Sequence, residues 1–159
     1  MTIQKLKKNL KELKKQKHFI DSCVWIELYL QEGKWEKVHD YIGELKNKKY
    51  KPHVNLIIIG EVIKTIKLKS KKQLEDINDF LSLLDLLGVK IIDITHISIY
   101  KGYNDFYDNL HVSKKDSMDI LNLSSAYNNT LNFFVTIEDK EKPIWKDNYL
   151  RNLIKIKTL

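Results

Sequence analysis

A single acid interrupts the apolar run Phe19-Ile20-Asp21-Ser22-Cys23-Val24-Trp25 near the start of the chain. An apolar run of this length is typical of a buried strand, and we predict the first strand from His18 to Val24. Strands of a parallel sheet are buried on both faces, and a buried carboxylate without a partner is costly. Asp21 is therefore the first candidate for a functional residue.

Segments with helical and with strand-like patterns alternate along the rest of the chain. We predict helices over residues 25–33, 35–46, 56–67, 74–87 and 96–110, and another from a capping box at 113–116 to about residue 129. Further strands are predicted at residues 53–54, 89–94, 132–136 and 153–157. This alternation favours an α/β domain with a central, mainly parallel sheet flanked by helices.

Local signals support several of these elements. Asn55 suits the N-cap of the helix over 56–67, and Gly88 suits the C-terminal glycine of the helix over 74–87. The three isoleucines at 57–59 would also suit a buried strand, and periodicity does not separate the two. The helix over 96–110 carries on one side Ile99, Tyr103, Phe106 and Leu110.

Residues 1–17, MTIQKLKKNLKELKKQK, form a separate unit of the prediction. They place Ile3, Leu6, Leu10 and Leu13 at helical spacing, with lysines on the other faces. We predict a basic amphipathic helix here, followed by one domain over residues 18–159. Either the helix docks its apolar stripe on the domain, or its lysines bind nucleic acid or another partner.

Composition restricts the class of protein. The 159 residues suit one domain. No apolar run approaches the roughly 20 residues that span a membrane, and no signal-peptide core follows the basic N-terminal residues. A soluble, cytoplasmic protein is therefore expected. A net charge of +7 permits a polyanionic partner. The one cysteine, Cys23, excludes an internal disulfide and is expected to be a buried structural thiol. The five glycines form no phosphate-binding loop, which counts against a nucleotide-binding or phosphatase-like domain.

Further acids fall where a parallel sheet would bring them together. Glu61 lies on the helix over 56–67, Asp119 lies on a helix of small and apolar residues, and Glu138 and Asp139 follow the strand ending at Thr136. Because ligands bind at the carboxyl ends of parallel strands, we expect these acids to converge on Asp21. Converging carboxylates repel one another unless a cation neutralises them, and ligands that are all oxygen suit Mg²⁺ or Mn²⁺ rather than Zn²⁺. Asp116, one turn before Asp119, either caps its helix or joins the site.

Four segments, in order, resemble the motifs of PIN-domain nucleases. The first is residues 19–28, an apolar run into Asp21 and Ser22; the second is residues 54–61, a helix carrying Glu61. The third is residues 119–126, where Asp119 opens a small-residue helix, and the fourth is residues 134–140, a strand into Thr136 and an acid. The spacing after Thr136 selects Glu138 as the fourth acid, whereas the following Asp-Lys pair selects Asp139. The basic N-terminal helix lies outside the minimal pattern.

The resemblance implies a PIN-like fold and a metal-dependent endoribonuclease that uses Mg²⁺ or Mn²⁺ to hydrolyse RNA phosphodiester bonds. Asp21 would be the central ligand, Glu61 and Asp119 would complete the site, and Glu138 or Asp139 would lie at its rim. Many small single-domain members are toxins of bacterial and archaeal toxin–antitoxin pairs, so an antitoxin protein is a candidate partner beside RNA. The alternative is a catalytically inactive PIN-like scaffold that binds RNA or a protein. The aromatic residues Tyr100, Tyr103, Phe106 and Tyr107 would pack in the core, form a homodimer interface or stack on RNA bases.

Overall fold

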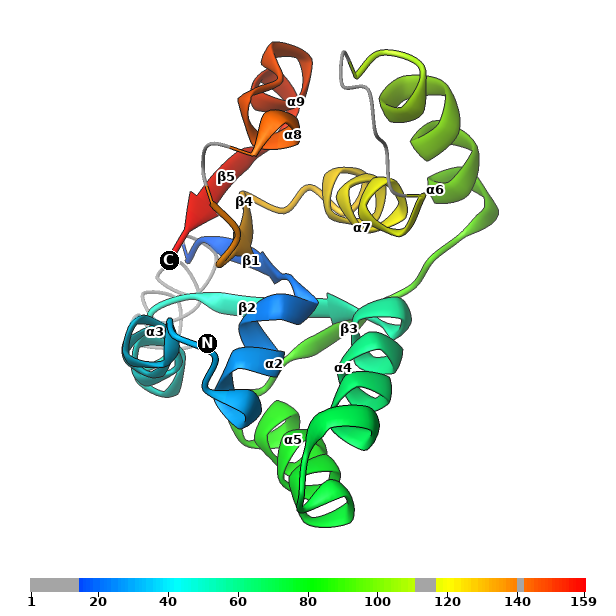
Figure 1. Cartoon of the computed structure of the whole chain (residues 1–159). Helices are drawn as coiled ribbons and strands as arrows, with labels where there is room; N and C mark the ends of the chain where they lie inside the picture. Colours follow the sequence, from blue (N-terminus) through cyan, green and yellow to red (C-terminus); the bar gives the residue numbers. More distant parts are fainter. Residues whose placement is uncertain (1–14, 111–116, 140–141) are drawn as a thin grey trace, which may run out of the picture.

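The computed structural model describes residues 15–110, 117–139 and 142–159. The expected basic helix, apart from its last three residues, and the expected capping box at 113–116 with Asp116 lie outside these residues. The described residues form one five-stranded sheet, in which every strand pairs in parallel with its neighbours in the order β3-β2-β1-β4-β5 (Figure 1). The strands are β1 (Lys17–Ile20), β2 (Lys51–Asn55), β3 (Lys90–Ile92), β4 (Phe133–Thr136) and β5 (Lys155–Thr158).

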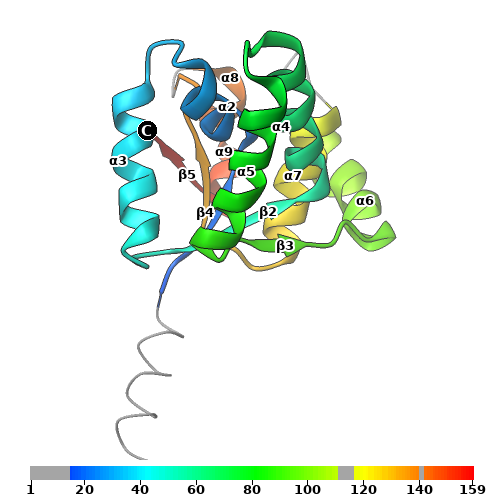
Figure 2. The same cartoon turned by 90° about the horizontal axis from the view of Figure 1, so that it is seen from below.

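Helices cover both faces of the sheet (Figure 1). One layer contains α2 (Ser22–Leu30), α3 (Trp35–Lys46), α4 (Leu56–Lys69) and α5 (Gln73–Leu87), and Figure 2 shows these four helices on the side nearest the viewer. The other layer contains α7 (Ser117–Asn128), α8 (Pro143–Lys146) and α9 (Asn148–Leu153), with α6 (His96–Lys101) and the π-helix η1 (Gly102–Tyr107) packed on α7. The α/β architecture with a parallel sheet flanked by helices, predicted from the sequence, is confirmed.

The chain changes its direction of winding between β1 and β4. From β1 it proceeds through β2 to β3 with helices on one face, and it then crosses over to β4 and β5 with helices on the other face (Figure 1). In open α/β sheets a crevice forms at such a switch point, outside the carboxyl ends of the two strands. Phe19 and Ile20 of β1 and Phe134 and Val135 of β4 are buried, so these two strands form the rigid centre of the domain.

Local chemistry accounts for the helices that the sequence predicted well. The helix α3 has the bounds expected for it. The side chain of Asn55 accepts a hydrogen bond of 3.0 Å from the backbone nitrogen of Ile58, so it is the N-cap of α4, and the isoleucines that follow are helical. Gly88 ends α5 with a φ of 63°, a conformation that glycine adopts without steric cost.

The predicted first strand was too long. The strand β1 ends at Ile20, and Asp21 lies after the strand instead of within it. Its carboxylate accepts a hydrogen bond of 2.8 Å from the backbone nitrogen of Ser22 and begins α2 there. An acid at an N-cap satisfies a free helix N–H, and this local gain outweighs the apolar pattern of the residues that follow.

The buried side of the segment over 96–110 also differs from the prediction. Phe106 and Leu110 are buried as expected, but Ile99 and Tyr103 are 43% and 44% exposed. Ser98 and Gly102 are buried in their place against α7. A side chain at Gly102 would bring its Cβ within 3.1 Å of the Cβ of Ser124, and the hydroxyl of Ser124 donates to the carbonyl of Ser98 at 2.6 Å. Small residues thus bring the two helices close together, and the larger apolar side chains turn outward.

Candidate active site

The switch point between β1 and β4 brings three polar residues together. The backbone nitrogen of Asp21 donates to the carbonyl of Val135 at 2.9 Å, which aligns the ends of the two strands. Thr136 is the last residue of β4, and its hydroxyl donates to Oδ2 of Asp21 at 3.1 Å. The same hydroxyl accepts a hydrogen bond of 3.1 Å from the backbone nitrogen of Glu138. Thr136 therefore positions Asp21 and the chain segment that carries Glu138 relative to each other.

Asp21 is buried, with 7% of the residue exposed. Burial raises the pKa of Asp21; the hydrogen bond from Cys23 opposes this shift, and the negative charge of Glu138 adds to it. A buried carboxylate beside a second one is stabilised by a cation, because the cation removes both the desolvation cost and the repulsion. Asp21 thus has the environment expected of a metal ligand.

The one cysteine contacts Asp21 directly. Its Sγ donates to Oδ2 of Asp21 at 3.1 Å and lies 3.2 Å from the hydroxyl oxygen of Thr136. Burial, followed by the charge of Asp21, raises the pKa of the Cys23 thiol well above its usual range, so the thiol stays protonated and donates. The sequence predicted only a structural role for Cys23, because its contact with Asp21 depends on the turn from β1 into α2.

A lysine that sequence analysis did not single out connects two of the other acids. The Nζ of Lys142 donates to both carboxylate oxygens of Glu138, at 2.7 and 2.8 Å, and lies 3.9 Å from Oδ2 of Asp119. Burial lowers the pKa of Lys142, but Glu138, Asp119 and Asp21 outweigh this effect and raise it. Asp119 and Glu138 therefore share a single ammonium group, and Asp21 lies near enough for its charge to act on that group.

Glu138 has a second partner on the same helix as Lys142. The Nε1 of Trp145, on α8, donates to Oε2 of Glu138 at 3.1 Å. Lys142 is the N-cap residue of α8, and its backbone nitrogen donates to the carbonyl of Asp139 at 2.9 Å. The short helix α8, which the sequence did not predict, and its N-cap residue thus supply the two side chains that hold Glu138.

The remaining predicted site residues take different places. Glu138 is half-buried and lies near enough to Asp21 for its charge to raise the pKa of Asp21, whereas Asp139 is exposed. Glu61 is half-buried on α4, a helix that contacts α7, where Asp119 lies in the first turn. Within the described part of the chain, no three His, Cys, Asp or Glu side chains are close enough together to hold a metal ion.

A buried pair of amides ties α4 to α7. The Nδ2 of Asn55 donates to Oδ1 of Asn122 at 3.0 Å, and both side chains are buried. Asn55 precedes the helix that carries Glu61, and Asn122 lies one turn after Asp119. This contact sets how α4 approaches α7, and with it the separation of the two helices that bear these acids. The cap at Asn55 is visible in the sequence, but its partner on α7 is not.

The donor set fits a hard divalent cation. Carboxylate oxygens are the ligands that Mg²⁺ and Mn²⁺ prefer, and one or two carboxylates are often all that a protein contributes to such an ion. Glu138 and Asp119, which share the ammonium group of Lys142, are the pair that would supply them. The ammonium of Lys142 shows that this edge of the sheet accepts a cation.

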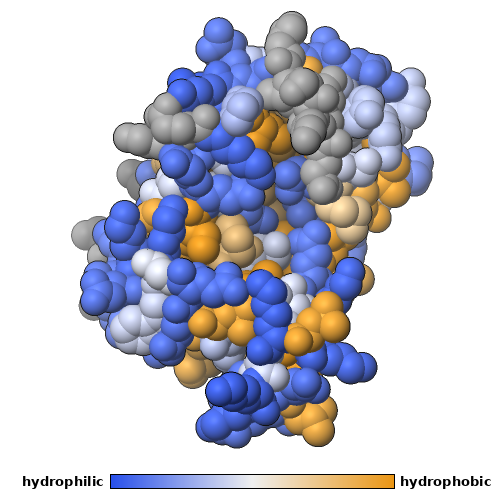
Figure 3. Space-filling view, viewed as in Figure 1, coloured by the Kyte–Doolittle hydropathy of each residue, from blue (hydrophilic) through white to orange (hydrophobic). Residues whose placement is uncertain are grey.

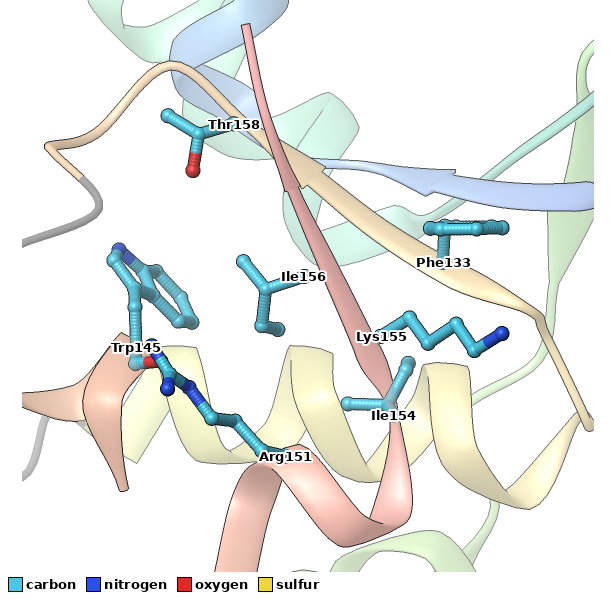
Figure 4. Close-up of a pocket in the computed structure, with 7 residues that line it drawn as sticks. All are labelled: Phe133, Trp145, Arg151, Ile154, Lys155, Ile156 and Thr158. Atoms are coloured by element: carbon cyan, nitrogen blue, oxygen red, sulfur yellow. The ribbon is translucent and has the colours of Figure 1, made fainter. Parts of the chain in front are cut away.

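A nearby pocket has a different character. Figure 4 shows it between β5 and the helices α8 and α9, with Trp145 and Arg151 beside the side chains of Ile154 and Ile156. No carboxylate occurs among the residues that line it, all of which are described, so it is not a metal site. Trp145 lines this pocket, and its indole nitrogen donates to Glu138. The same side chain therefore connects the apolar pocket to the acid.

Hydrophilic residues cover most of the face in Figure 3, with smaller hydrophobic patches between them. The described segments contain no helix with both the length and the apolar character that crossing a membrane requires.

No protein-family model and no curated protein matches this chain. Several solved structures do. A chain of VapBC2 from Rickettsia felis, solved bound to a DNA fragment from their promoter, matches with a TM-score of 0.68 and 14% identity, over 91% of this chain and 99% of that one.

Two further solved structures match in the same way. VapC20 from Mycobacterium tuberculosis, described as a Sarcin-Ricin loop cleaving toxin, has a TM-score of 0.60 and 9% identity over 78% of this chain and 91% of its own. FitAcB from Neisseria gonorrhoeae has a TM-score of 0.58 and 13% identity over 89% of this chain and 96% of its own. At such low identities the similarity shows the fold, which is that of the VapC/PIN-domain toxin structures.

Proposed function

We propose that this chain, built on the PIN-domain toxin fold, is a metal-dependent endoribonuclease that hydrolyses RNA phosphodiester bonds. The observation that carries the proposal is the buried acid Asp21 at the switch point, where the charge of Glu138 helps to raise its pKa. A carboxylate buried in this way is costly for stability alone and is typical of a site selected for chemistry.

Asp21, Asp119 and Glu138 would hold Mg²⁺ or Mn²⁺, with Glu61 approaching from α4 and Asp139 at the rim. When bound, the metal would lower the pKa of an attacking water and neutralise charge on the phosphate. Thr136 and Cys23 orient Asp21 through their hydrogen bonds to Oδ2. The burial of Asp21 keeps bulk water away from that oxygen and strengthens its interaction with a cation.

RNA is the proposed substrate because the chain carries a net charge of +7 and because one structural relative is described as a toxin that cleaves the Sarcin-Ricin loop. We further propose that the chain is the toxin of a toxin–antitoxin pair, since the relatives include VapBC2. The exposed side chains of Ile97, Tyr100 and Tyr103 offer a surface for the antitoxin or for a second copy.

A second candidate function is a catalytically inactive PIN-like scaffold that binds RNA or a protein. Two observations favour it: Lys142 already neutralises Glu138 and Asp119, and the acids among the described residues form no three-ligand group.

Cleavage of a mixed RNA pool by the purified chain distinguishes the two functions. We expect cleavage in millimolar Mg²⁺ or Mn²⁺, none in EDTA, and none with Asp21→Asn. The variant must show an unchanged circular dichroism spectrum and cooperative unfolding, so that loss of activity reports the missing charge. Equal cleavage by wild type and a folded Asp21→Asn variant would refute the assignment. RNA binding without cleavage would support the scaffold.

A further inference from the structure

We propose that Lys142 is a built-in counter-cation of the carboxylate site, which holds Glu138 and Asp119 in the metal-free protein and competes there with the divalent ion. The inference rests on the proposed function, because it concerns the same carboxylates. It assigns a role to a residue that lies outside the four sequence motifs.

The contacts of Lys142 use the oxygens that a metal would need. Its Nζ lies 2.7 and 2.8 Å from the two carboxylate oxygens of Glu138 and 3.9 Å from Oδ2 of Asp119. A Mg²⁺ ion binds carboxylate oxygens at about 2.0–2.1 Å, so an ion on Glu138 would lie within a few ångströms of an ammonium group in this position. Two cations at such a separation repel strongly at a partly buried site. Metal binding through Glu138 is therefore opposed by Lys142 and favoured when Lys142 leaves.

Lys142 can leave without disturbing the fold. Its side chain is 40% exposed, more than the side chains of Glu138 and Asp119, at 33% and 32%. It lies at the beginning of α8, and its ammonium group lies 5.7 Å from the centre of the Trp145 ring. Rotation about the lysine side-chain bonds moves the ammonium group into solvent while the backbone stays in place.

Glu138 keeps its position when Lys142 leaves, because Trp145 holds it independently. The indole Nε1 of Trp145 donates to Oε2 of Glu138, and Trp145 is 2% exposed. The backbone nitrogen of Glu138 is also bound to the hydroxyl of Thr136. A departing Lys142 would thus free the oxygens of a carboxylate that is already oriented.

The test compares four forms of the full chain: wild type, Lys142→Met, Lys142→Arg and the control Lys146→Met. Methionine keeps the length and apolar stem of lysine and removes the charge, whereas arginine keeps the charge. Lys146 is an exposed lysine at the other end of the same helix, so its removal changes the net charge by the same amount. Two quantities are measured: the affinity for Mn²⁺ by titration calorimetry, and the melting temperature in EDTA and in saturating Mn²⁺.

We expect Lys142→Met to bind Mn²⁺ at least about tenfold more tightly than wild type, because a competing charge a few ångströms away is gone. Lys142→Arg and Lys146→Met should stay within about twofold of wild type. In EDTA, Lys142→Met should melt at a lower temperature than wild type, since its carboxylates lose their counter-ion, and saturating Mn²⁺ should remove that difference.

Unchanged or weaker Mn²⁺ affinity in a folded Lys142→Met variant overturns the inference, and if wild type still cleaves RNA, the proposed function survives. If Lys142→Met binds Mn²⁺ more tightly but the wild type cleaves no RNA, the counter-cation role of Lys142 is supported and the proposed nuclease activity is refuted. If no form binds Mn²⁺ and wild type does not cleave, both proposals are wrong.

Discussion

The hydroxyl of Thr136 and the carboxylate of Asp21 form a hydrogen bond of 3.1 Å between residues that are 115 positions apart in the chain. Each residue stands at the end of its strand, and β1 and β4 are neighbours in the sheet. The same hydroxyl binds the backbone nitrogen of Glu138. One side chain thus sets the position of Asp21 relative to the segment that carries Glu138, whose charge raises the pKa of Asp21.

Replacing Thr136 with valine should therefore reduce metal-dependent cleavage. Valine keeps the shape of threonine and removes the hydroxyl, and the loss of a partner that orients a ligand typically lowers metal affinity or activity by about 10- to 100-fold. The unfolding free energy should fall by only about 1 kcal/mol, the usual value of one hydrogen bond. Thr136→Ser retains the hydroxyl and is the control; its activity should stay close to wild type. Full activity in a folded Thr136→Val variant would show that Asp21 needs no such orientation.

Replacing Asp21 with asparagine should raise the stability of the metal-free protein at neutral pH. Burial raises the pKa of Asp21, so its ionised form is less stable in the folded protein than in the unfolded chain. The pKa of Asp21 is about 3.9 in the unfolded chain and higher in the folded protein. As the pH rises through this interval, the wild type therefore loses stability relative to the variant. Melting temperatures of both proteins in EDTA, measured from pH 4 to pH 8, should diverge in this direction. A wild type that is equally or more stable at pH 8 would contradict it.

Millimolar Mg²⁺ or Mn²⁺ should raise the melting temperature of the wild type by mass action. A ligand at one hundred times its dissociation constant stabilises the folded state by about 2.7 kcal/mol. Glu61→Gln and Asp119→Asn should each weaken this response if both acids approach the metal. The matched control is Asp79→Asn, which removes an exposed acid on α5. Its melting temperature should rise with the metal as much as that of the wild type. If the wild type shows neither a shift nor cleavage, the inactive scaffold becomes the better interpretation.

Stability should also fall in mild acid because of His18, at the opposite end of β1 from Asp21. His18 is 1% exposed, its Nδ1 lies 2.8 Å from the hydroxyl of Tyr41, and its ring stacks on Tyr50. Burial, together with the charge of Lys157, lowers the pKa of His18 to about 4. As the pH falls, His18 is therefore protonated near pH 6.5 in the unfolded chain but only near pH 4 in the folded protein.

The loss of unfolding free energy from His18 between pH 6.5 and pH 4 is at most about 3 kcal/mol. Urea denaturation at several pH values measures it, and His18→Phe should flatten the slope whatever its effect on absolute stability. Parallel slopes for the two proteins would assign the acid sensitivity to other groups, of which His53, whose pKa is also lowered by burial, is the first to examine.

The basic segment at residues 1–17 should contribute to RNA affinity and not to chemistry. Lysine–phosphate contacts are independent of sequence and weaken with salt. A variant with Lys7, Lys8, Lys14 and Lys15 changed to glutamine keeps the apolar stripe of this segment. It should bind RNA more weakly at low salt, with a shallower salt dependence, and its metal response should be unchanged. Equal affinity and equal salt slopes would place the RNA contacts elsewhere on the protein.

The sequence by itself determined the features that depend on neighbours a few residues away. The periodicity of residues 35–46 predicted α3 with the bounds it has, the side chain of Asn55 predicted the cap of α4, and Gly88 predicted the end of α5. The alternation of these elements was sufficient to predict a parallel sheet, because helices must connect parallel strands. The short helices α8 and α9 carry too few residues for a period to be visible.

Only the tertiary structure decided what surrounds Asp21. The strand order makes β1 and β4 neighbours, and this alone brings Thr136 and Glu138 to Asp21. In the segment after β4, Glu138 is half-buried and near enough to Asp21 to act on its pKa, whereas Asp139 is exposed. Lys142 resembles any of the other lysines in the sequence, and its contacts join the segment after β4, which carries Glu138, to α7, which carries Asp119. Such contacts join residues that are distant in sequence, and their identity follows from packing in three dimensions, which no local pattern records.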